Sequence, residues 1–141
     1  MKRVRVTGFT LLEMTLVLLL IGLLATLVVP RVLGRTAQAR RVRAAAELQI
    51  LSQALEGYRL DAGVYPTTAQ GLDALVRQPA LPPRPARWRP DGYLPRVPHD
   101  PWNHVYQYAS SDGRHFTLRS LGADGEPGGD GEAADVDVDA P

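Results

Sequence analysis

A glutamate stands inside a long apolar run near the start of the chain. The run covers residues 9–29, and Glu13 is its only charged residue. Moving a carboxylate into hydrocarbon costs about 2.5–3.5 kcal/mol on insertion scales, so an acidic residue at such a place indicates a function and a charged partner. If the chain were cut after Gly8, the new amine on Phe9 would be a cation near the membrane surface. That amine is a natural partner for Glu13 of a neighbouring copy.

A glycine-rich acidic segment near the C-terminus is the second group with chemical potential. After Arg119 the chain has seven acidic residues and no basic one. Hard oxygen ligands suit calcium, which takes about six to eight of them, and glycines let backbone carbonyls turn inward. A solvated acidic tail is the other interpretation, and composition alone favours neither. The acids are Asp124, Glu126, Asp130, Glu132, Asp135, Asp137 and Asp139.

No catalytic constellation is recognisable in the sequence. The three histidines have no cysteine or second histidine at metal-ligand spacing, so we expect ordinary surface or turn residues. They are His99, His104 and His115. The serines in turn or strand context show no nucleophile-elbow pattern. The sequence therefore predicts a protein that is not an enzyme.

The apolar run is long enough to be a membrane-spanning helix. At 1.5 Å per residue, its roughly 21 residues just cross a hydrocarbon core of about 30 Å. A cleaved secretory signal would be shorter, roughly 7–15 apolar residues, and would end in a small-x-small site. We therefore expect a basic leader over residues 1–8, a transmembrane and polymerisation helix over residues 9–30, and a globular domain over residues 31–141.

The helical pattern continues beyond the apolar run. Pro30 predicts a kink or local melting, because it removes a backbone hydrogen bond and clashes with the preceding turn. Residues 37–60 are rich in good helix formers and have an apolar stripe at helical spacing. The stripe consists of Ile50, Leu51, Ala54, Leu55 and Tyr58. The first sixty residues are thus predicted to form one long helix, hydrophobic all round and then amphipathic.

Glycine and proline then divide the chain. Gly63 is expected to end the long helix, and a short helix is predicted over residues 70–77 with Thr67 or Thr68 as its N-cap. Residues 79–101 contain eight prolines and predict a long irregular loop. A packed loop is the favoured interpretation, and a polyproline ligand for a partner is the alternative. The residues expected to pin the loop are Trp88, Tyr93 and Leu94.

Strand patterns occur only late in the chain. Residues 105–109 and 115–120 alternate on either side of a turn at residues 111–113, which predicts a β-hairpin. One hairpin is marginally stable by itself and must pack on the amphipathic helix. The predicted fold class is α+β, with a small antiparallel sheet on the distal half of the long helix.

Charge and cysteine content limit the function further. The net charge is +1, and there are no cysteines, so disulfide and thiol chemistry are excluded. The arginines of residues 31–43 lack interleaved aromatics and follow the apolar run directly, where phospholipid headgroups are the nearest anions. We expect no nucleic-acid partner. Three bases precede the apolar run and five arginines follow it, a count that by itself favours a leader outside the cytoplasm.

The start of the chain resembles the class III signal of type IV pilins and type II secretion pseudopilins. The matching residues after the basic leader are Gly8-Phe9-Thr10-Leu11-Leu12-Glu13. In that family a prepilin peptidase cuts after the glycine and N-methylates the phenylalanine. The resemblance implies a pilin-like fold, cleavage between Gly8 and Phe9, a cytoplasmic leader, and a role for Glu13 in assembly.

Three further stretches resemble one branch of that family, the major pseudopilins of type II secretion systems. They are residues 65–75 (YPTTAQGLDAL), residues 100–108 (DPWNHVYQY), and residues 120–129 (SLGADGEPGG) followed by Ala134-Asp135-Val136. The chain departs from the family at Asn103-His104, where a Gly-Asn pair is usual. It departs again at the end, where the usual Asn-Trp pair is missing.

The resemblance implies a calcium ion in the acidic segment. The family holds one calcium through a leucine carbonyl and aspartates, and Leu121, Asp124 and Asp135 match that motif. Asp130 and Asp137 are further candidate ligands. The implied function is that of a structural subunit polymerising into a periplasmic filament that drives export of folded proteins across the outer membrane.

The implied partners are further copies of the chain in a helical homopolymer, minor pseudopilins, the prepilin peptidase, the inner-membrane assembly platform and membrane lipid. The implied location is the bacterial inner membrane, crossed once, with the C-terminal domain in the periplasm. One alternative is a type IV pilin or minor pilin, although those often carry a C-terminal disulfide. Another is a membrane-anchored calcium-binding periplasmic protein, which would leave the Gly8 to Glu13 pattern unexplained.

Overall fold

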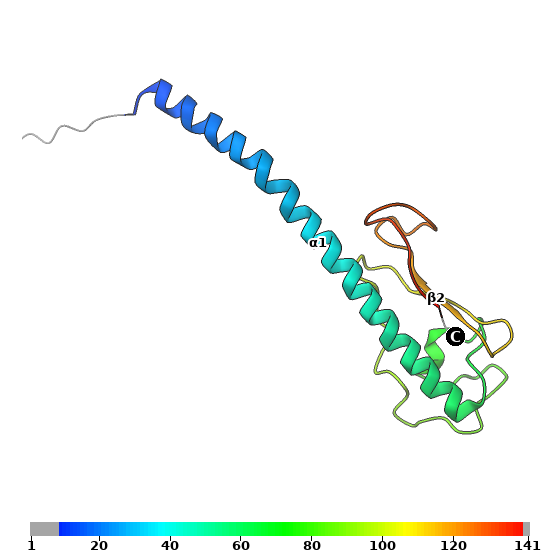
Figure 1. Ribbon diagram of the computed structural model, residues 1–141. Coiled ribbons are helices and arrows are strands. Elements are labelled where there is room, and N and C mark those ends of the chain that lie inside the picture. The colour runs from blue at the N-terminus through cyan, green and yellow to red at the C-terminus, as the bar shows by residue number, and fades with distance from the viewer. Residues whose placement is uncertain (1–8, 140–141) are drawn as a thin grey trace, which may run out of the picture. The chain divides into compact units, whose positions relative to one another are not determined.

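A single long helix, α1 (Leu11–Ala62), forms the N-terminal part of the protein (Figure 1). The computed structural model describes residues 9–139, except for the side chains of residues 25–35 and 139. The chain divides into two compact units, Met1–Thr36 and Ala37–Pro141, and α1 contributes to both. The helical assignment is continuous across Pro30, so the local melting predicted there does not occur.

The helix ends where the sequence predicts. Gly63 adopts a φ of +83°, and its N–H donates to the carbonyl of Arg59 at 2.7 Å. A glycine in this left-handed conformation is a common helix terminator, since it has no Cβ to clash. Arg59 lies in the last turn, where a positive charge is favourable next to the unpaired carbonyls.

The first unit exposes its apolar side chains. Between Phe9 and Leu24 the large hydrophobic residues are 43–84% exposed, as expected for a helix that is apolar on every side. Over the residues that the structure describes, no helix is both long and apolar enough to span a membrane. The predicted span over residues 9–30 extends into residues 25–30, whose side chains lie outside the described ones.

The second unit is built on one face of α1. Its buried positions repeat at intervals of three and four residues and are Ala44, Leu48, Leu51, Ala54, Leu55 and Tyr58. The predicted stripe was wrong at Ile50, which is 54% exposed. At about 100° per residue, Ile50 lies about 200° around the helix from Leu48 and faces away from the core.

A three-stranded antiparallel sheet packs on this face. Its strands are β1 (Gln107–Ala109), β2 (Thr117–Ser120) and β3 (Val136–Asp139), in the order β1-β2-β3. The predicted hairpin is confirmed as β1 and β2, with shorter strands. The third strand was not predicted. Leu118 pairs with Tyr108 on one side and with Val138 on the other, so β3 extends the sheet beyond β2.

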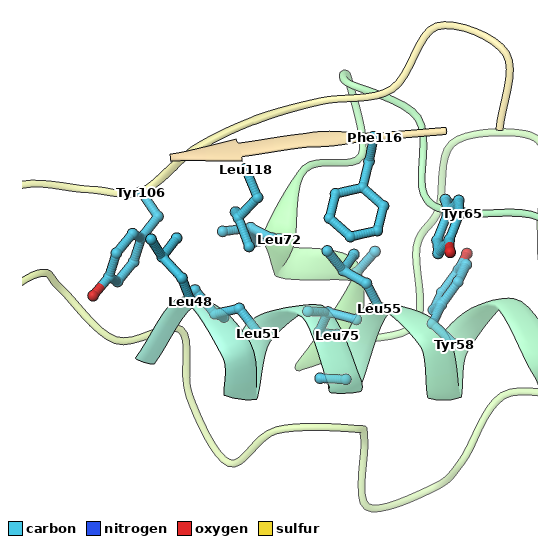
Figure 2. Close-up of a cluster of buried hydrophobic side chains, with 12 residues drawn as sticks. Leu48, Leu51, Leu55, Tyr58, Tyr65, Leu72, Leu75, Tyr106, Phe116 and Leu118 are labelled. Carbon is cyan, nitrogen blue, oxygen red and sulfur yellow. The ribbon is translucent and has the colours of Figure 1, made fainter. Parts of the chain in front are cut away.

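Side chains from the sheet and the helix meet in one core (Figure 2). Phe116, just before β2, and Leu118 of β2 point toward α1, which contributes Leu51 and Leu55 to the core. Tyr65 packs edge-on against Phe116, with ring centroids 4.8 Å apart. Full burial of each such side chain stabilises the fold by about 1.5–3 kcal/mol. The α+β fold class predicted from the sequence is confirmed.

The predicted short helix over residues 70–77 is instead one 3₁₀ turn, η1 (Leu72–Leu75). Gly71 precedes it with a φ of +60°, which prevents a regular helix from beginning earlier. Thr67 does act as a cap, but for the preceding turn. Its hydroxyl accepts the Gln70 N–H at 3.2 Å, and the Gln70 side chain accepts the Thr67 N–H at 2.9 Å.

The proline-rich loop is packed against the domain, as the favoured interpretation predicted. Trp88 donates its indole N–H to the Ala74 carbonyl at 3.1 Å. Tyr93 donates its hydroxyl to Asp61 at 3.1 Å, and Arg89 pairs with the same carboxylate at 2.8 Å. Burial, reinforced by Asp61, raises the pKa of Tyr93 to about 12. The loop is therefore anchored to the end of α1, which argues against an open polyproline ligand.

Candidate functional site

The N-terminal candidate residues lie at the start of α1. Glu13 is exposed in the first turn, and its N–H donates to the Thr10 hydroxyl at 3.1 Å. This is the threonine half of a capping box, Thr-x-x-Glu, a pattern visible in the sequence that our sequence analysis missed. A carboxylate in the first turn is favoured by the unpaired N–H groups there. Gly8, on the other side of the predicted cleavage point, lies outside the described residues.

Most of the acidic candidate residues belong to the glycine-rich loop, residues 121–135, which connects β2 and β3. The loop closes on itself through backbone hydrogen bonds. Ala123 donates to the Glu132 carbonyl at 2.9 Å, and Asp135 donates to the Gly128 carbonyl at 3.1 Å. A Cβ on Gly122 would lie 2.7 Å from the Ala133 carbonyl oxygen, so only glycine permits this approach.

The structure places the five predicted calcium ligands unequally. Leu121 is buried beside the end of the second strand, whereas Asp124 and Asp130 are exposed on the loop. Asp135 has a side chain only 15% exposed and accepts the Gly128 N–H at 3.1 Å. Asp137 lies on β3 rather than in the loop. Among the described residues, no three acidic, histidine or cysteine side chains come close enough to hold a metal.

Arg119 limits which of these carboxylates could bind an ion. Its guanidinium lies 3.6 Å from Asp135 and 4.0 Å from Asp137. It therefore neutralises part of the charge that a cation would meet on the Asp135 side of the loop. The donor chemistry still suits calcium, because Leu121 offers a carbonyl and Asp124 and Asp135 offer two carboxylates.

A buried carboxylate supports the start of the loop. Asp100 is 4% exposed and accepts the N–H groups of Trp102 and His104 at 3.0 and 2.7 Å. It also accepts the hydroxyl of Ser120 at 2.6 Å, at the end of the second strand. The ring of His104 lies 3.0 Å from the Gly122 carbonyl. The turn at residues 100–104 is thus bound to the glycine-rich loop, a connection that we did not predict.

The other two histidines have different surroundings. His115 is an exposed residue in the turn before the second strand, with its ring 2.8 Å from Asp112. That hydrogen bond, helped by two backbone N–H groups, holds the pKa of Asp112 well below its usual range. His99 is exposed and pairs through its backbone with Val105.

Comparison with known proteins agrees with this architecture. A family model described as type II secretion system (T2SS), protein G matches residues 31–139. The type II secretion system core protein G of Pseudomonas aeruginosa is 44% identical over 137 residues, which cover 96% of each chain. The protein of the same name from Vibrio cholerae is 46% identical over 138 residues, covering 96% of this chain and 94% of the relative.

The chain belongs to the type II secretion protein G family. The crystal structure of the major pseudopilin from the type 2 secretion system of enterohaemorrhagic Escherichia coli aligns with a TM-score of 0.66 and 39% identity. The alignment covers 78% of this chain and 95% of that one. These matches confirm the resemblance drawn from the sequence motifs. As a protein G family member, the chain is a structural subunit of the type II secretion pseudopilus.

Proposed function

We propose that copies of this chain polymerise through α1 into a periplasmic filament that drives export of folded proteins across the outer membrane. The proposal depends on a difference in side-chain exposure between the two parts of α1. Its described N-terminal part exposes apolar residues on every side, whereas its C-terminal part buries one face under a compact domain. A helix that is apolar all round needs lipid or other apolar helices around it. A filament of packed helices and a bilayer both supply such an environment.

Processing of the leader would prepare the chain for assembly. A prepilin peptidase would cut between Gly8 and Phe9 and methylate the new amine. Removal of Lys2, Arg3 and Arg5 changes the formal net charge from +1 to −2. The new amine would then lie close to the first turn of α1, where Thr10 holds the backbone of Glu13. Glu13 of a neighbouring copy is its partner in this proposal.

The proposed location is the bacterial inner membrane, crossed once by residues 9–30, with the C-terminal domain in the periplasm. The proposed partners are other copies, minor pseudopilins, the prepilin peptidase, the assembly platform and membrane lipid. The exposed apolar residues between Phe9 and Leu24 support contact with lipid and with other helices. The arginines that follow them are suited to phospholipid headgroups.

Calcium is the proposed ligand of the glycine-rich loop. Leu121, Asp124 and Asp135 would hold it, with Asp130 and Asp137 as further candidates. The ion supplies positive charge that neutralises repulsion among carboxylates confined to one short segment. The chain's own residues order the loop. The hydrogen bonds between Gly128 and Asp135 close it, and Asp100 fixes its beginning by accepting the Ser120 hydroxyl.

Replacement of Glu13 tests the assembly mechanism. Glu13→Gln keeps the shape of the side chain but removes its charge, so the variant should be inserted and cleaved but should polymerise poorly. Loss of one partner of a buried charge pair costs about 3–5 kcal/mol, because the other charge is left without a partner. Mass spectrometry of the membrane fraction reports cleavage and methylation, and electron microscopy of sheared filaments reports assembly.

Thr15→Ala is the matched control, because Thr15 lies two positions along the same helix and its hydroxyl donates to the local Leu12 carbonyl. It should form filaments normally. Normal filaments from Glu13→Gln would show that the carboxylate has another role. An intact leader, or a cut beyond the apolar run, would contradict the proposed processing.

A further inference from the structure

One arginine of α1 reaches across to the glycine-rich loop. The Nη1 of Arg41 donates to the carbonyls of Gly131 and Ala134 at 2.7 and 2.8 Å. Its Nη2 lies 3.5 Å from the carbonyl of Asp135. Figure 1 shows the loop, coloured orange to red, beside the cyan part of α1. One side chain thus joins the helix to three backbone carbonyls that lie 90 to 94 positions away in the sequence.

The chemistry of this contact requires arginine. A guanidinium has five N–H donors in a planar fork, so it can bind several carbonyl oxygens at once in a fixed geometry. An ammonium group is a point charge without that fork. The neighbouring Arg40 differs, because it forms a 3.6 Å ion pair with the Glu132 side chain, and both side chains are exposed. Surface pairs of this kind contribute little to stability.

The loop needs such a fixed point. All five glycines of the loop have positive φ angles, namely Gly122, Gly125, Gly128, Gly129 and Gly131. Glycine loses more conformational freedom on ordering than any other residue, so a loop of this composition is costly to hold in one shape. Arg41 binds the C-terminal half of the loop, which ends at Asp135. The hydrogen bond from Ala123 to Glu132 joins this half to the N-terminal half, which begins at Leu121.

We propose that Arg41 is a positioning residue that holds the glycine-rich loop closed before calcium arrives. The inference rests on the proposed binding of calcium by Leu121, Asp124 and Asp135. By fixing the C-terminal half of the loop, Arg41 sets the distance between Asp135 and the other two proposed ligands, Leu121 and Asp124. The ion then meets a loop that is already ordered, and less of its binding free energy is lost to ordering.

The test uses the full chain purified in detergent, with calcium chloride as the ligand. Arg41→Met keeps much of the side-chain length but removes the fork, and Arg40→Met is the matched control on the next residue. Isothermal titration should show calcium affinity at least tenfold weaker for Arg41→Met and within about twofold of wild type for Arg40→Met. Hydrogen exchange in chelator should show faster exchange at residues 131–135 in Arg41→Met alone.

Arg41→Lys separates charge from geometry. It retains the positive charge but not the fork, so it should behave like Arg41→Met. Wild-type affinity in Arg41→Met would overturn the proposal, as would tighter binding, which would show that Arg41 competes with the ion. If the wild-type chain binds no calcium, the proposed calcium site is wrong, and Arg41 has no role in calcium affinity. In that case exchange in chelator still shows whether Arg41 orders the loop.

Discussion

Asn103 adopts a backbone conformation that is more usual for glycine. It has a φ of +72°, in the left-handed region that favours glycine, and the family motif has glycine at this place. Asparagine tolerates this region better than most residues. The turn can therefore bend sharply enough for Asp100 to accept two backbone N–H groups. The adjacent His104, which replaces the usual asparagine, contacts the Gly122 carbonyl.

At the same scale, Glu56 should make stability depend on acid pH. The hydrogen bond from Tyr65, together with the Arg59 pair, lowers the pKa of Glu56 in the folded state. A depressed carboxyl pKa contributes stability above the unfolded-state value of about 4.3, and this is lost as the pH falls through the folded-state pKa. In urea unfolding between pH 3 and 7, Glu56→Gln should therefore be less stable than wild type near neutrality, and the difference should shrink toward pH 3.

Tyr65→Phe provides the second arm of that experiment. It removes the hydroxyl but keeps the ring that packs against Phe116. Its free energy of unfolding should also converge with that of wild type at low pH. A constant difference across the pH range would show that the two residues contribute packing and not the lowered pKa.

At the scale of elements, periodicity in the sequence predicted the long helix and the hairpin. It failed where pairing with another strand or the backbone conformation of one residue decides the structure. The third strand has a strand-like alternation, Val136-Asp137-Val138-Asp139, but its aspartates made the segment resemble an acidic tail. Pairing with β2 and burial of part of Val138 outweigh that composition. At η1, the positive φ of Gly71 limited a predicted helix to one turn.

The buried stripe of α1 offers a direct comparison of two apolar residues. Leu55 is fully buried, and Ile50 is 54% exposed on the opposite side. Leu55→Ala should lower the free energy of unfolding by about 2–5 kcal/mol, the usual result of a cavity in a core. Ile50→Ala should change it by about 0.5 kcal/mol or less. Urea denaturation of both variants measures this, and similar losses would contradict the placement of Ile50 outside the core.

At the scale of the whole molecule, the sequence identified candidate residues but not the contacts that hold them in place. The motifs around Gly8 and Leu121 identified which residues to consider. Sequence patterns could not show that Arg119 lies beside Asp135, or that Arg41 reaches the loop from α1. Those contacts join positions far apart in the chain, and local periodicity carries no information about them.

Calcium should stabilise the folded chain as a whole. Binding to the folded state alone adds about 2.7 kcal/mol at a hundredfold excess over Kd. The melting temperature of the wild-type chain should therefore fall by at least several degrees in chelator. Asp124→Ala should abolish that difference, whereas Asp73→Ala, an exposed aspartate on the 3₁₀ turn, should retain it. Equal melting temperatures with and without calcium in the wild-type chain would leave the loop as a solvated acidic segment.

The confinement of the core to the second unit has a mechanical consequence. Every member of the core cluster lies between Leu48 and Leu118, and the described residues before Thr36 contribute none. Under the proposed function, a subunit must leave a lipid environment and enter a protein one during each round of assembly. Because the second unit contains every residue of the core cluster, its own packing holds it together, and the proposed change of surroundings need not unfold it. The free energy of that exchange then depends on the surroundings of the apolar segment, and the same folded domain can be recycled between bilayer and filament.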